Sequence, residues 1–250
     1  MNRQIIAGLI VAAALAAGGG YYFWPQRAPT PAPAPVATGP HIDNPLGPAA
    51  PVPLPTLADS DDPFGADLAT LFHSAALPEL FYPTRLARRF VATVDNLPRE
   101  QVAATVRLMR PPEDVLAVRG EEPSLSLAPE NSARYAKYLE LLAAVDSHQA
   151  VGVYRKFYPL LQQAYDELGY PGHYFNDRVV EVIDHLLASP EVADPVPLIH
   201  PSVMYKFADP RIETRSAGQK AMIRIGHDNA AAIKAKLREI RAQIATQPPA

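Results

Sequence analysis

Apolar side chains recur every three or four residues over most of the chain after residue 59, which is the spacing of one face of an α-helix. The clearest runs predict amphipathic helices over 151–168 and 230–244. Further runs of this kind predict helices over 64–73, 84–95, 98–110, 131–146 and 176–188. Pro159 lies inside the predicted helix 151–168, where the loss of a backbone hydrogen bond predicts a kink. The pattern therefore predicts a mainly α-helical domain of about seven helices.

Residues that cap or stop helices mark several of the predicted ends. Asp228 or Asn229 is expected to cap the start of 230–244, and Asn176 or Asp177 the start of 176–188, because such side chains accept hydrogen bonds from free amides. Gly169 follows 151–168 as a stop signal. Strand signals are short and isolated, at 115–118, 125–127 and 203–207. They predict at most one minor β-hairpin beside the helices.

The first 24 residues follow a different pattern, because no charged side chain occurs between residues 5 and 24. Twenty residues at about 1.5 Å per residue span roughly the 30 Å hydrocarbon core of a bilayer. Arg3 precedes the run, and four aromatic residues close it, as expected at a membrane interface: Tyr21, Tyr22, Phe23 and Trp24. We therefore predict a transmembrane anchor within residues 1–24, with a cytoplasmic N-terminus and the bulk of the chain outside the cytoplasm.

A cleaved signal peptide is the alternative for this segment, because residues 14–16 (Ala-Leu-Ala) fit a cleavage site after a short apolar stretch. Small residues also recur every four positions and would let two such helices pair closely in a membrane: Gly8, Ala12, Ala16 and Gly20. A homo-oligomer is one expectation from this stripe, although an alanine-rich segment produces such a stripe by composition alone.

Proline changes the pattern between residues 25 and 58. The chain has 28 prolines, and 11 of them fall between Pro25 and Pro55. Proline fixes φ and lacks an amide donor, so we predict a disordered, extended linker over 25–58. The soluble helical domain then occupies 59–247, either as one body or as two lobes, 59–128 and 129–247.

Composition and charge exclude several classes of function. The formal net charge is −3 without a long run of one sign, which is not the pattern of a nucleic-acid-binding protein. The absence of cysteine excludes disulfides, thiolate zinc sites, iron–sulfur clusters and cysteine nucleophiles. No G-x-S-x-G, P-loop, H-E-x-x-H or dinucleotide-binding motif occurs. We therefore expect no cofactor and no nucleic-acid partner.

One group has residue types suited to a metal ion or to acid–base chemistry: His173, Asp177, Glu181 and His185. On a helical wheel, Asp177, Glu181 and His185 lie opposite the apolar residues of 176–188. A solvated polar face explains this placement, and ligands on one exposed face would need partners from another element. A metal site at these residues stays the weaker alternative.

A second group of candidates would serve as a ligand or partner surface. Arg85, Arg88 and Arg89 share one helical face and would suit an anionic lipid head group or wall polymer, although pairing with acids such as Glu79 is the simpler explanation. Residues in two loops complete the set: Tyr170, Tyr174, Phe175, Asp209, Gln219 and Lys220. For these loops, packing onto the core is the simpler interpretation.

Several short segments of the soluble region carry a resemblance to a known family. They are 88–91 (Arg-Arg-Phe-Val), 95–98 (Asp-Asn-Leu-Pro), 169–171 (Gly-Tyr-Pro), 176–178 (Asn-Asp-Arg), 207–210 (Phe-Ala-Asp-Pro) and 216–220 (Ser-Ala-Gly-Gln-Lys). With these segments the chain resembles the bacterial family named domain of unknown function 3014, as does its order of anchor, proline-rich linker and helical domain. The resemblance implies an envelope protein of Gram-negative bacteria and brings no activity, ligand or catalytic residue.

These observations favour a single-pass inner-membrane protein that presents a helical interaction or scaffold domain to the periplasm. Its expected partner is another envelope protein or a cell-wall component. The alternatives are an envelope enzyme, such as a metal-assisted hydrolase that uses residues 173–185, and a periplasmic protein released by signal cleavage. Because no catalytic motif occurs, we assign no catalytic residue and favour a protein that is not an enzyme.

Overall fold

The computed structural model describes residues 42–46, 53–74, 77–113, 115–202 and 204–246. The predicted anchor at 1–24, with its stripe of Gly8, Ala12, Ala16 and Gly20, lies outside these residues. Within them, no helix combines the length and the apolar character that crossing a bilayer requires. The anchor and the pairing of two anchors therefore stay predictions.

Helices dominate the described residues. Seven of them have at least eight residues: α2 (Asp61–Phe72), α4 (Leu86–Asn96), α5 (Ala136–Ala144), α6 (Ser147–Glu167), α7 (Phe175–Leu187), α9 (Ala217–Arg224) and α10 (His227–Ile244). Short helical turns join them: α3 (Leu77–Leu80), α8 (Pro210–Glu213) and the 3-10 helices η1 (Ala104–Val106) and η2 (Pro129–Tyr135). The predicted mainly helical fold with about seven long helices is confirmed.

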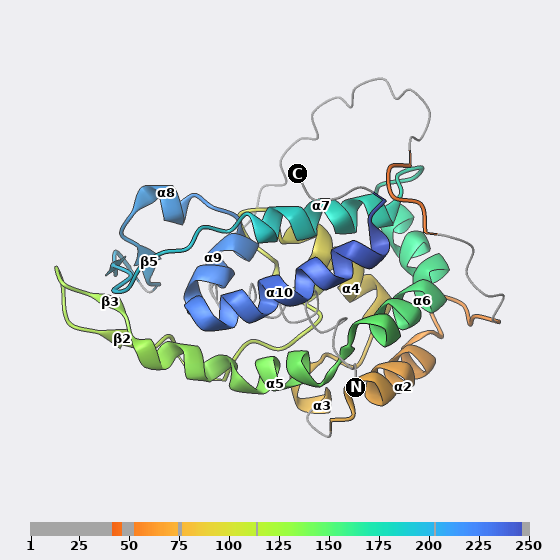
Figure 1. Cartoon of the computed structure of the whole chain (residues 1–250), viewed down its shortest axis with the longest axis horizontal. Helices are drawn as coiled ribbons and strands as arrows, with labels where there is room; N and C mark the ends of the chain where they lie inside the picture. The colour runs from red at the N-terminus through yellow and green to blue at the C-terminus, as the bar shows by residue number, and fades with distance from the viewer. Residues whose placement is uncertain (1–41, 47–52, 75–76, 114, 203, 247–250) are drawn as a thin grey trace.

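The helix α4 is central to the helical body, because it packs against α2, α6 and α7. Leu86, Phe90 and Val94 of α4 are buried, which confirms the apolar face that their spacing predicts. In Figure 1, α10 runs along the body between α7 and α5, and it contacts both. The apolar stripes of the long helices therefore face one another across a shared interior.

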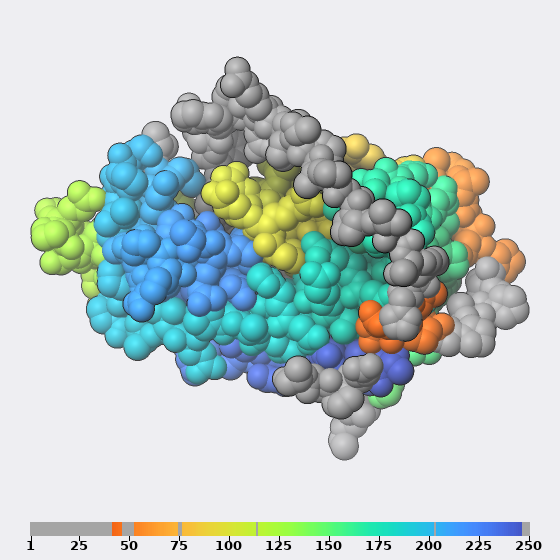
Figure 2. All heavy atoms as spheres, turned by 90° about the horizontal axis from the view of Figure 1, so that it is seen from above, coloured from red at the N-terminus to blue at the C-terminus, as the bar shows by residue number. Residues whose placement is uncertain are grey.

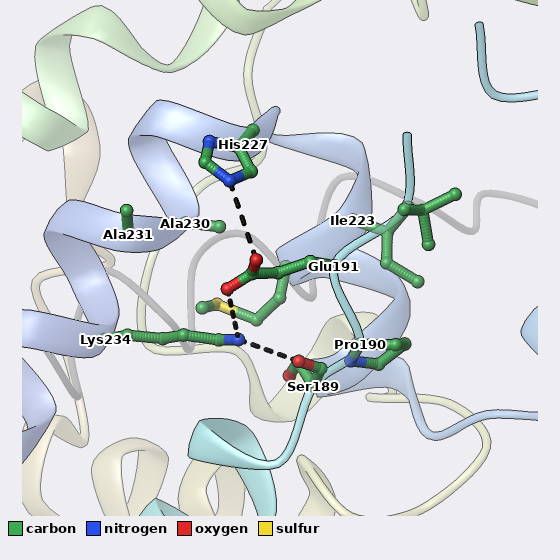
Figure 3. A pocket seen from close by; sticks show the side chains of 10 residues that line it. Ser189, Pro190, Glu191, Ile223, His227, Ala230, Ala231 and Lys234 are labelled. Carbon is green, nitrogen blue, oxygen red and sulfur yellow. Dashed lines mark hydrogen bonds and ion pairs between the residues drawn. The ribbon is translucent and has the colours of Figure 1, made fainter. Parts of the chain in front are cut away.

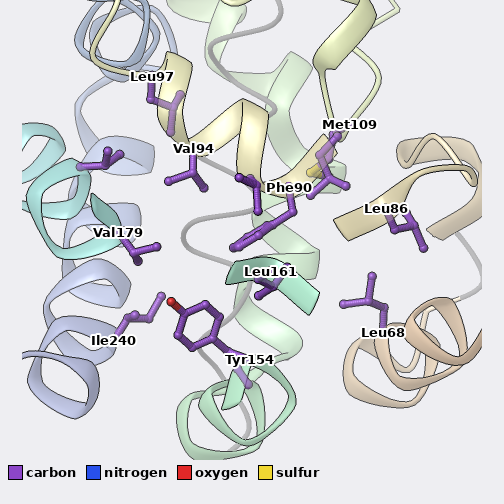
Figure 4. Close-up of a cluster of buried hydrophobic side chains, with 14 of the residues drawn as sticks. Leu68, Leu86, Phe90, Val94, Leu97, Met109, Tyr154, Leu161, Val179 and Ile240 are labelled. Carbon is purple, nitrogen blue, oxygen red and sulfur yellow. The ribbon is translucent and has the colours of Figure 1, made fainter. Parts of the chain in front are cut away.

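One large cluster of buried apolar side chains fills this interior. It draws residues from Leu57 to Ile244, so both of the lobes considered above contribute to it. Phe90 makes aromatic pairs with Tyr154 and Phe175, with ring centroids 6.5 and 6.2 Å apart. Figure 4 shows Phe90 and Tyr154 at the middle of this cluster. Burial of apolar surface, at about 25 cal/mol per Å², is the main force that holds the helices together.

Two short antiparallel ladders stand at one end of the long axis (Figure 1). They pair β2 (Val118–Arg119) with β3 (Ser126–Leu127), and β4 (Leu198–Ile199) with β5 (Lys206–Phe207). An isolated bridge between Ser126 and Pro197 joins the ladders, and a second apolar cluster lies among them. The sequence predicts at most one hairpin, so it misses one of the two ladders. The missed strand is β4, which lies between Pro197 and Pro201, and proline is rare in strands.

Residues 98–110 do not form the predicted helix. Only η1 makes a single 3-10 turn there, and the segment packs along α4. The Thr93 hydroxyl donates to the carbonyl of Val106 (3.0 Å) and accepts from the amide of Leu108 (3.0 Å). Phe81 and Met109 form a β-bridge. These tertiary bonds use backbone groups that a helix would need, so tertiary packing overrides the local helical tendency.

Two helices start at earlier residues than the sequence predicts. The helix α6 begins four residues early, because the Asp146 side chain caps it by accepting from two amides of the first turn (2.8 and 3.0 Å). The helix α10 begins after Gly226, whose φ of 89° is a left-handed conformation that suits glycine. Asp228 and Asn229 therefore lie inside α10 and are not its caps.

Part of the predicted linker is bonded to the domain. The Asp177 carboxylate accepts hydrogen bonds from the amides of Asp43 and Asn44 (3.2 and 2.7 Å). Asn176 donates its side-chain amide to the carbonyl of Asn44 (2.8 Å), and the Asn44 side-chain oxygen accepts from the amide of Thr246 (3.0 Å). The prediction of a disordered linker is therefore wrong for residues 43–46, because these bonds fix them.

The same bonds explain why α7 starts differently from the prediction. The helix begins at Phe175, and neither Asn176 nor Asp177 caps it with a side-chain hydrogen bond. Both side chains instead hold residues 43–46, which Figure 2 shows in orange beside α7. We call residues 43–46 the docked segment.

Candidate functional site

Three of the four candidate metal ligands bind separate partners in the structure, and the fourth, His173, lies edge-on to the ring of Tyr170, with centroids 6.3 Å apart. Asp177 binds the docked segment, Glu181 pairs with Arg178 (2.8 Å), and the His185 ring is 2.7 Å from the Ser216 hydroxyl. In the described parts of the chain, no three His, Asp or Glu side chains form a group that could hold a metal ion. The polar face of α7 is solvated only in part, because two of its members bind other elements of the fold.

His185 should make the stability of the fold depend on pH. Burial, and then the nearby Arg178 and Arg215, lower the pKa of His185 below its ordinary value of 6.5. The unfolded chain therefore binds a proton at a higher pH than the folded one, so stability falls as pH drops through about 6.5. We expect His185→Gln to flatten this slope, measured as urea unfolding at a series of pH values. An unchanged slope would show that the ring titrates equally in both states.

A charged junction around Asp95 is absent from the sequence-based candidates. The Asp95 side chain is 2% exposed and accepts from Arg99 (2.7 Å), Arg178 (3.0 Å) and the Tyr170 hydroxyl (3.3 Å). Arg178 also donates to the backbone carbonyl of Asp95 (2.9 Å). A buried carboxylate needs such partners to offset the loss of water. The signal in the sequence is an acid one helical turn after Val91, within the apolar side of α4.

The helix α9 packs onto the same junction through its first turn. The amides of Ala217 and Gly218 donate to the carbonyls of Arg99 and Leu97 (2.7 and 2.9 Å). A Cβ atom on Gly218 would lie 2.6 Å from a methyl group of Leu186 and 3.1 Å from the carbonyl oxygen of Leu97. This close approach of α9 to the end of α4 therefore requires glycine.

Gly218→Ala should lower the free energy of unfolding by about 1–3 kcal/mol, because the added methyl group overpacks this contact. Gly152→Ala is the matched control, since Gly152 is also helical and no atom lies within 4 Å of the position of its Cβ. The control should be neutral or stabilising by up to about 1 kcal/mol. Equilibrium denaturation of both variants measures the difference, and equal stabilities would contradict the close approach.

Three polar residues expected on a partner surface make contacts within the fold: Asp209, Gln219 and Lys220. The Gln219 side chain donates to the carbonyl of His185 (2.9 Å), and the Lys220 ammonium donates to that of Glu213 (3.1 Å). Both side chains are buried. Asp209 caps α8 by accepting from the amide of Arg211 (2.8 Å). These contacts stabilise local structure and leave Gln219 and Lys220 without an exposed surface.

The loop from Tyr170 to Phe175 packs onto the core, as the simpler interpretation expects. Tyr170 stacks on Tyr165 with ring centroids 4.7 Å apart. The Tyr174 hydroxyl accepts from the amide of Leu46 in the docked segment (3.0 Å), and Phe175 is fully buried. Phe175 therefore belongs to the core and to no partner surface.

The three arginines near the start of α4 have different surroundings. Arg88 pairs with Glu167 of α6 (2.9 Å) and is neutralised there. Arg89 donates to three backbone carbonyls, at 3.0, 3.1 and 2.7 Å. Arg85 is exposed, and its backbone amide binds the Asp61 carboxylate (2.6 Å). The expected pairing with Glu79 does not occur, because Glu79 pairs with a lysine of α5.

Arg89 and Arg110 share the aromatic ring of Tyr82. Their guanidinium carbons lie 4.6 and 4.7 Å from its centroid, within the range of cation–π attraction. Backbone bonds fix the arrangement, since Tyr82 donates to the carbonyl of Leu108 (3.1 Å) and Arg110 to that of Leu80 (2.8 Å). We call the four exposed or half-buried side chains here the arginine–tyrosine surface: Tyr82, Arg85, Arg89 and Arg110.

A small cleft lies between residues 189–192 and α10 (Figure 3). The buried Lys234 ammonium donates to the carbonyl of Ser189 (2.7 Å). Glu191 lies 3.8 Å from this ammonium and 3.7 Å from the His227 ring. The cavity volume of about 30 Å³ suits a water molecule and is far below that of substrate pockets. We assign it no ligand.

The fold and these contacts define a class of protein, a mainly helical domain in which buried polar side chains join α4, α7 and α9. The family model described as Protein of unknown function (DUF3014) matches residues 86–241. Since this is more than half of the chain, the protein belongs to that family. Comparison with curated proteins finds no match, and neither does comparison with solved structures.

Four of the segments that carry the family resemblance meet at the Asp95 junction. They are 95–98, 169–171, 176–178 and 216–220, which supply Asp95, Tyr170, Arg178 and the first turn of α9. Their side chains bond mainly to one another and to backbone. The residues that make the chain recognisable are therefore, for the most part, those that fix the helices in place.

Proposed function

We propose that the protein presents a helical, non-catalytic interaction domain to the periplasm from an anchor in the inner membrane. The docked segment is the observation that carries this proposal. Asp43 and Asn44 are bonded to α7, and Asn44 is also bonded to Thr246 beyond α10. The domain is thereby held at a defined point by the chain that leads back to the predicted anchor. A scaffold needs such a fixed attachment if one of its faces is to meet a partner.

The roles of the candidate site residues support an interaction domain over the metal-assisted hydrolase. Asp177 is bonded to the docked segment, and His185 to Ser216. Gln219 and Lys220 donate to carbonyls inside the fold. Side chains of the types found in catalytic sites thus bond within the fold. The arginine–tyrosine surface, by contrast, remains available to a partner.

Three measurements on intact cells and purified protein test the placement. A reporter enzyme that is active only outside the cytoplasm, fused after the C-terminus, should be active. The protein should stay in the membrane fraction at alkaline pH, and its intact mass should include residues 1–16. An inactive reporter would contradict the proposed orientation, and loss of residues 1–16 with release from the membrane would favour the periplasmic alternative.

Crosslinking in intact cells tests the interaction role. Photo-activatable residues at Leu168 and Ile199, two exposed apolar positions, should capture a recurrent envelope partner that mass spectrometry identifies. Equivalent residues at Ala69 and Ala235, exposed positions on α2 and α10, serve as matched controls for random collision. Failure to capture any recurrent partner from all four positions would count against the proposal.

A further inference from the structure

The arginine–tyrosine surface carries positive charge that the fold positions without neutralising. Arg89 uses Nε and Nη1 for its bonds to backbone carbonyls, and its Nη2 makes no hydrogen bond within the described residues. Arg85 and Arg110 are exposed. In the described ranges, none of the three forms an ion pair with a carboxylate. Two guanidinium groups thus lie over the ring of Tyr82, and the exposed Arg85 is close enough to Arg89 to act on its charge.

Two acids near this surface, Asp61 and Glu79, already bind other groups. The two Asp61 oxygens accept from the amides of Arg85 and Leu86 (2.6 and 2.7 Å). Glu79 pairs with Lys137 (3.5 Å). Burial, and then repulsion from the nearby Arg85, lower the pKa of Arg89, and Tyr82 and the Asp61 carboxylate oppose this more weakly. A bound anion would relieve this repulsion.

The ligand chemistry follows from the donors that remain. A guanidinium offers planar, paired N–H donors that match the oxygens of phosphate. Tyr82 adds an amphipathic ring, and such rings suit the level of lipid head groups. Because the chain as a whole carries a net charge of −3, attraction to an anionic surface has to come from a local group such as this one.

We propose that Arg85, Arg89 and Arg110 around Tyr82 form a binding surface for the phosphate groups of anionic phospholipids. The inference rests on the proposed function, because the anchor keeps the domain within reach of the bilayer. Lipid is favoured over a wall polymer because the proposed anchor places the domain beside the phosphates of the membrane itself. Docking through this surface would orient the domain on the membrane.

A fluorescence experiment on the full chain tests this surface. The absence of cysteine lets a single Ala104→Cys variant carry a fluorophore beside the site, on the exposed turn η1. The labelled protein is reconstituted into vesicles of phosphatidylcholine alone or with phosphatidylglycerol, each with a quencher on the head groups. Quenching should be stronger with phosphatidylglycerol and should weaken as salt is added.

Two double variants separate the site from general charge. Arg85→Gln with Arg110→Gln removes two free cations and keeps Arg89, which holds the backbone. It should lower the ratio of docked to undocked protein by about 30-fold. Arg119→Gln with Arg211→Gln removes the same charge from exposed residues paired with Glu130 and Asp209, and it should retain most of the docking. Equal losses in both double variants would overturn the inference.

Further outcomes distinguish the inference from the proposed function. If the full chain does not float with neutral vesicles, the anchor fails and the proposed function with it. If it floats but quenching ignores phosphatidylglycerol, only the lipid surface is refuted. A response of the label to soluble anionic wall fragments in neutral vesicles, without a response to phosphatidylglycerol, would assign the surface to the wall and overturn the lipid proposal.

Discussion

Phe175→Ala is expected to lower the free energy of unfolding by about 3–5 kcal/mol, measured by equilibrium denaturation in urea. The ring is fully buried and packs against Phe90 and Tyr165, with centroids 6.2 and 5.2 Å away. These neighbours belong to α4 and α6, whose positions are fixed by other contacts. The space left by the ring would therefore stay open as a cavity rather than collapse.

Val115→Ala is the control for this substitution. Val115 is 87% exposed, so its truncation should change stability by less than about 0.5 kcal/mol. The comparison matters because Phe175 is a candidate for a partner surface on sequence grounds. If both variants were equally stable, Phe175 would have to lie outside the core.

Asp95→Ala should lower the free energy of unfolding by about 3 kcal/mol, because it leaves Arg178 without its buried carboxylate. The Arg178 side chain is 18% exposed, whereas that of Arg99 is 52% exposed and can turn to water. We therefore expect most of the loss to come from Arg178. Denaturation of purified protein measures the change, and a loss below about 1 kcal/mol would contradict a buried junction.

Two further variants identify the cause of the loss at Asp95. Glu167→Ala removes the acid of an exposed pair with Arg88, and it should cost about 0–1 kcal/mol. Arg178→Met combined with Asp95→Ala should recover part of the stability, since no unpaired charge is then buried. Failure of the double variant to recover would point to packing rather than charge.

The long helices were predictable because their apolar positions repeat with the helical period over many turns. The central helix α4 is one example, with Leu86, Phe90 and Val94 on its buried side. Residues 98–110 show the limit of predicting helices from the repeat of apolar positions. Their fold depends on Thr93 and on the bridge from Phe81 to Met109, which join positions distant in sequence. A local pattern carries no information about such pairs.

The candidate site was predictable only in part, for a related reason. Arg85 and Arg89 follow from the sequence. The pairing that neutralises Arg88 does not, because its partner Glu167 lies 79 positions away on another helix. Arg110 becomes part of the surface because the backbone next to it pairs with the end of α3. The metal hypothesis for residues 173–185 treated side chains as one set, whereas Asp177 and His185 bind other elements of the fold and Glu181 pairs with Arg178 of its own helix.

The docked segment also sets the length of the free linker between the proposed anchor and the domain. From Trp24 to Ile42 the chain can span at most about 60 Å, and release of the segment would extend this limit to about 110 Å at Leu57. The local concentration of a tethered domain falls roughly as the −3/2 power of linker length, so release would dilute it about two- to threefold. If residues 1–24 anchor the domain as proposed, the hydrogen bonds of Asn44 with Asp177, Asn176 and Thr246 would adjust how often the domain meets the membrane.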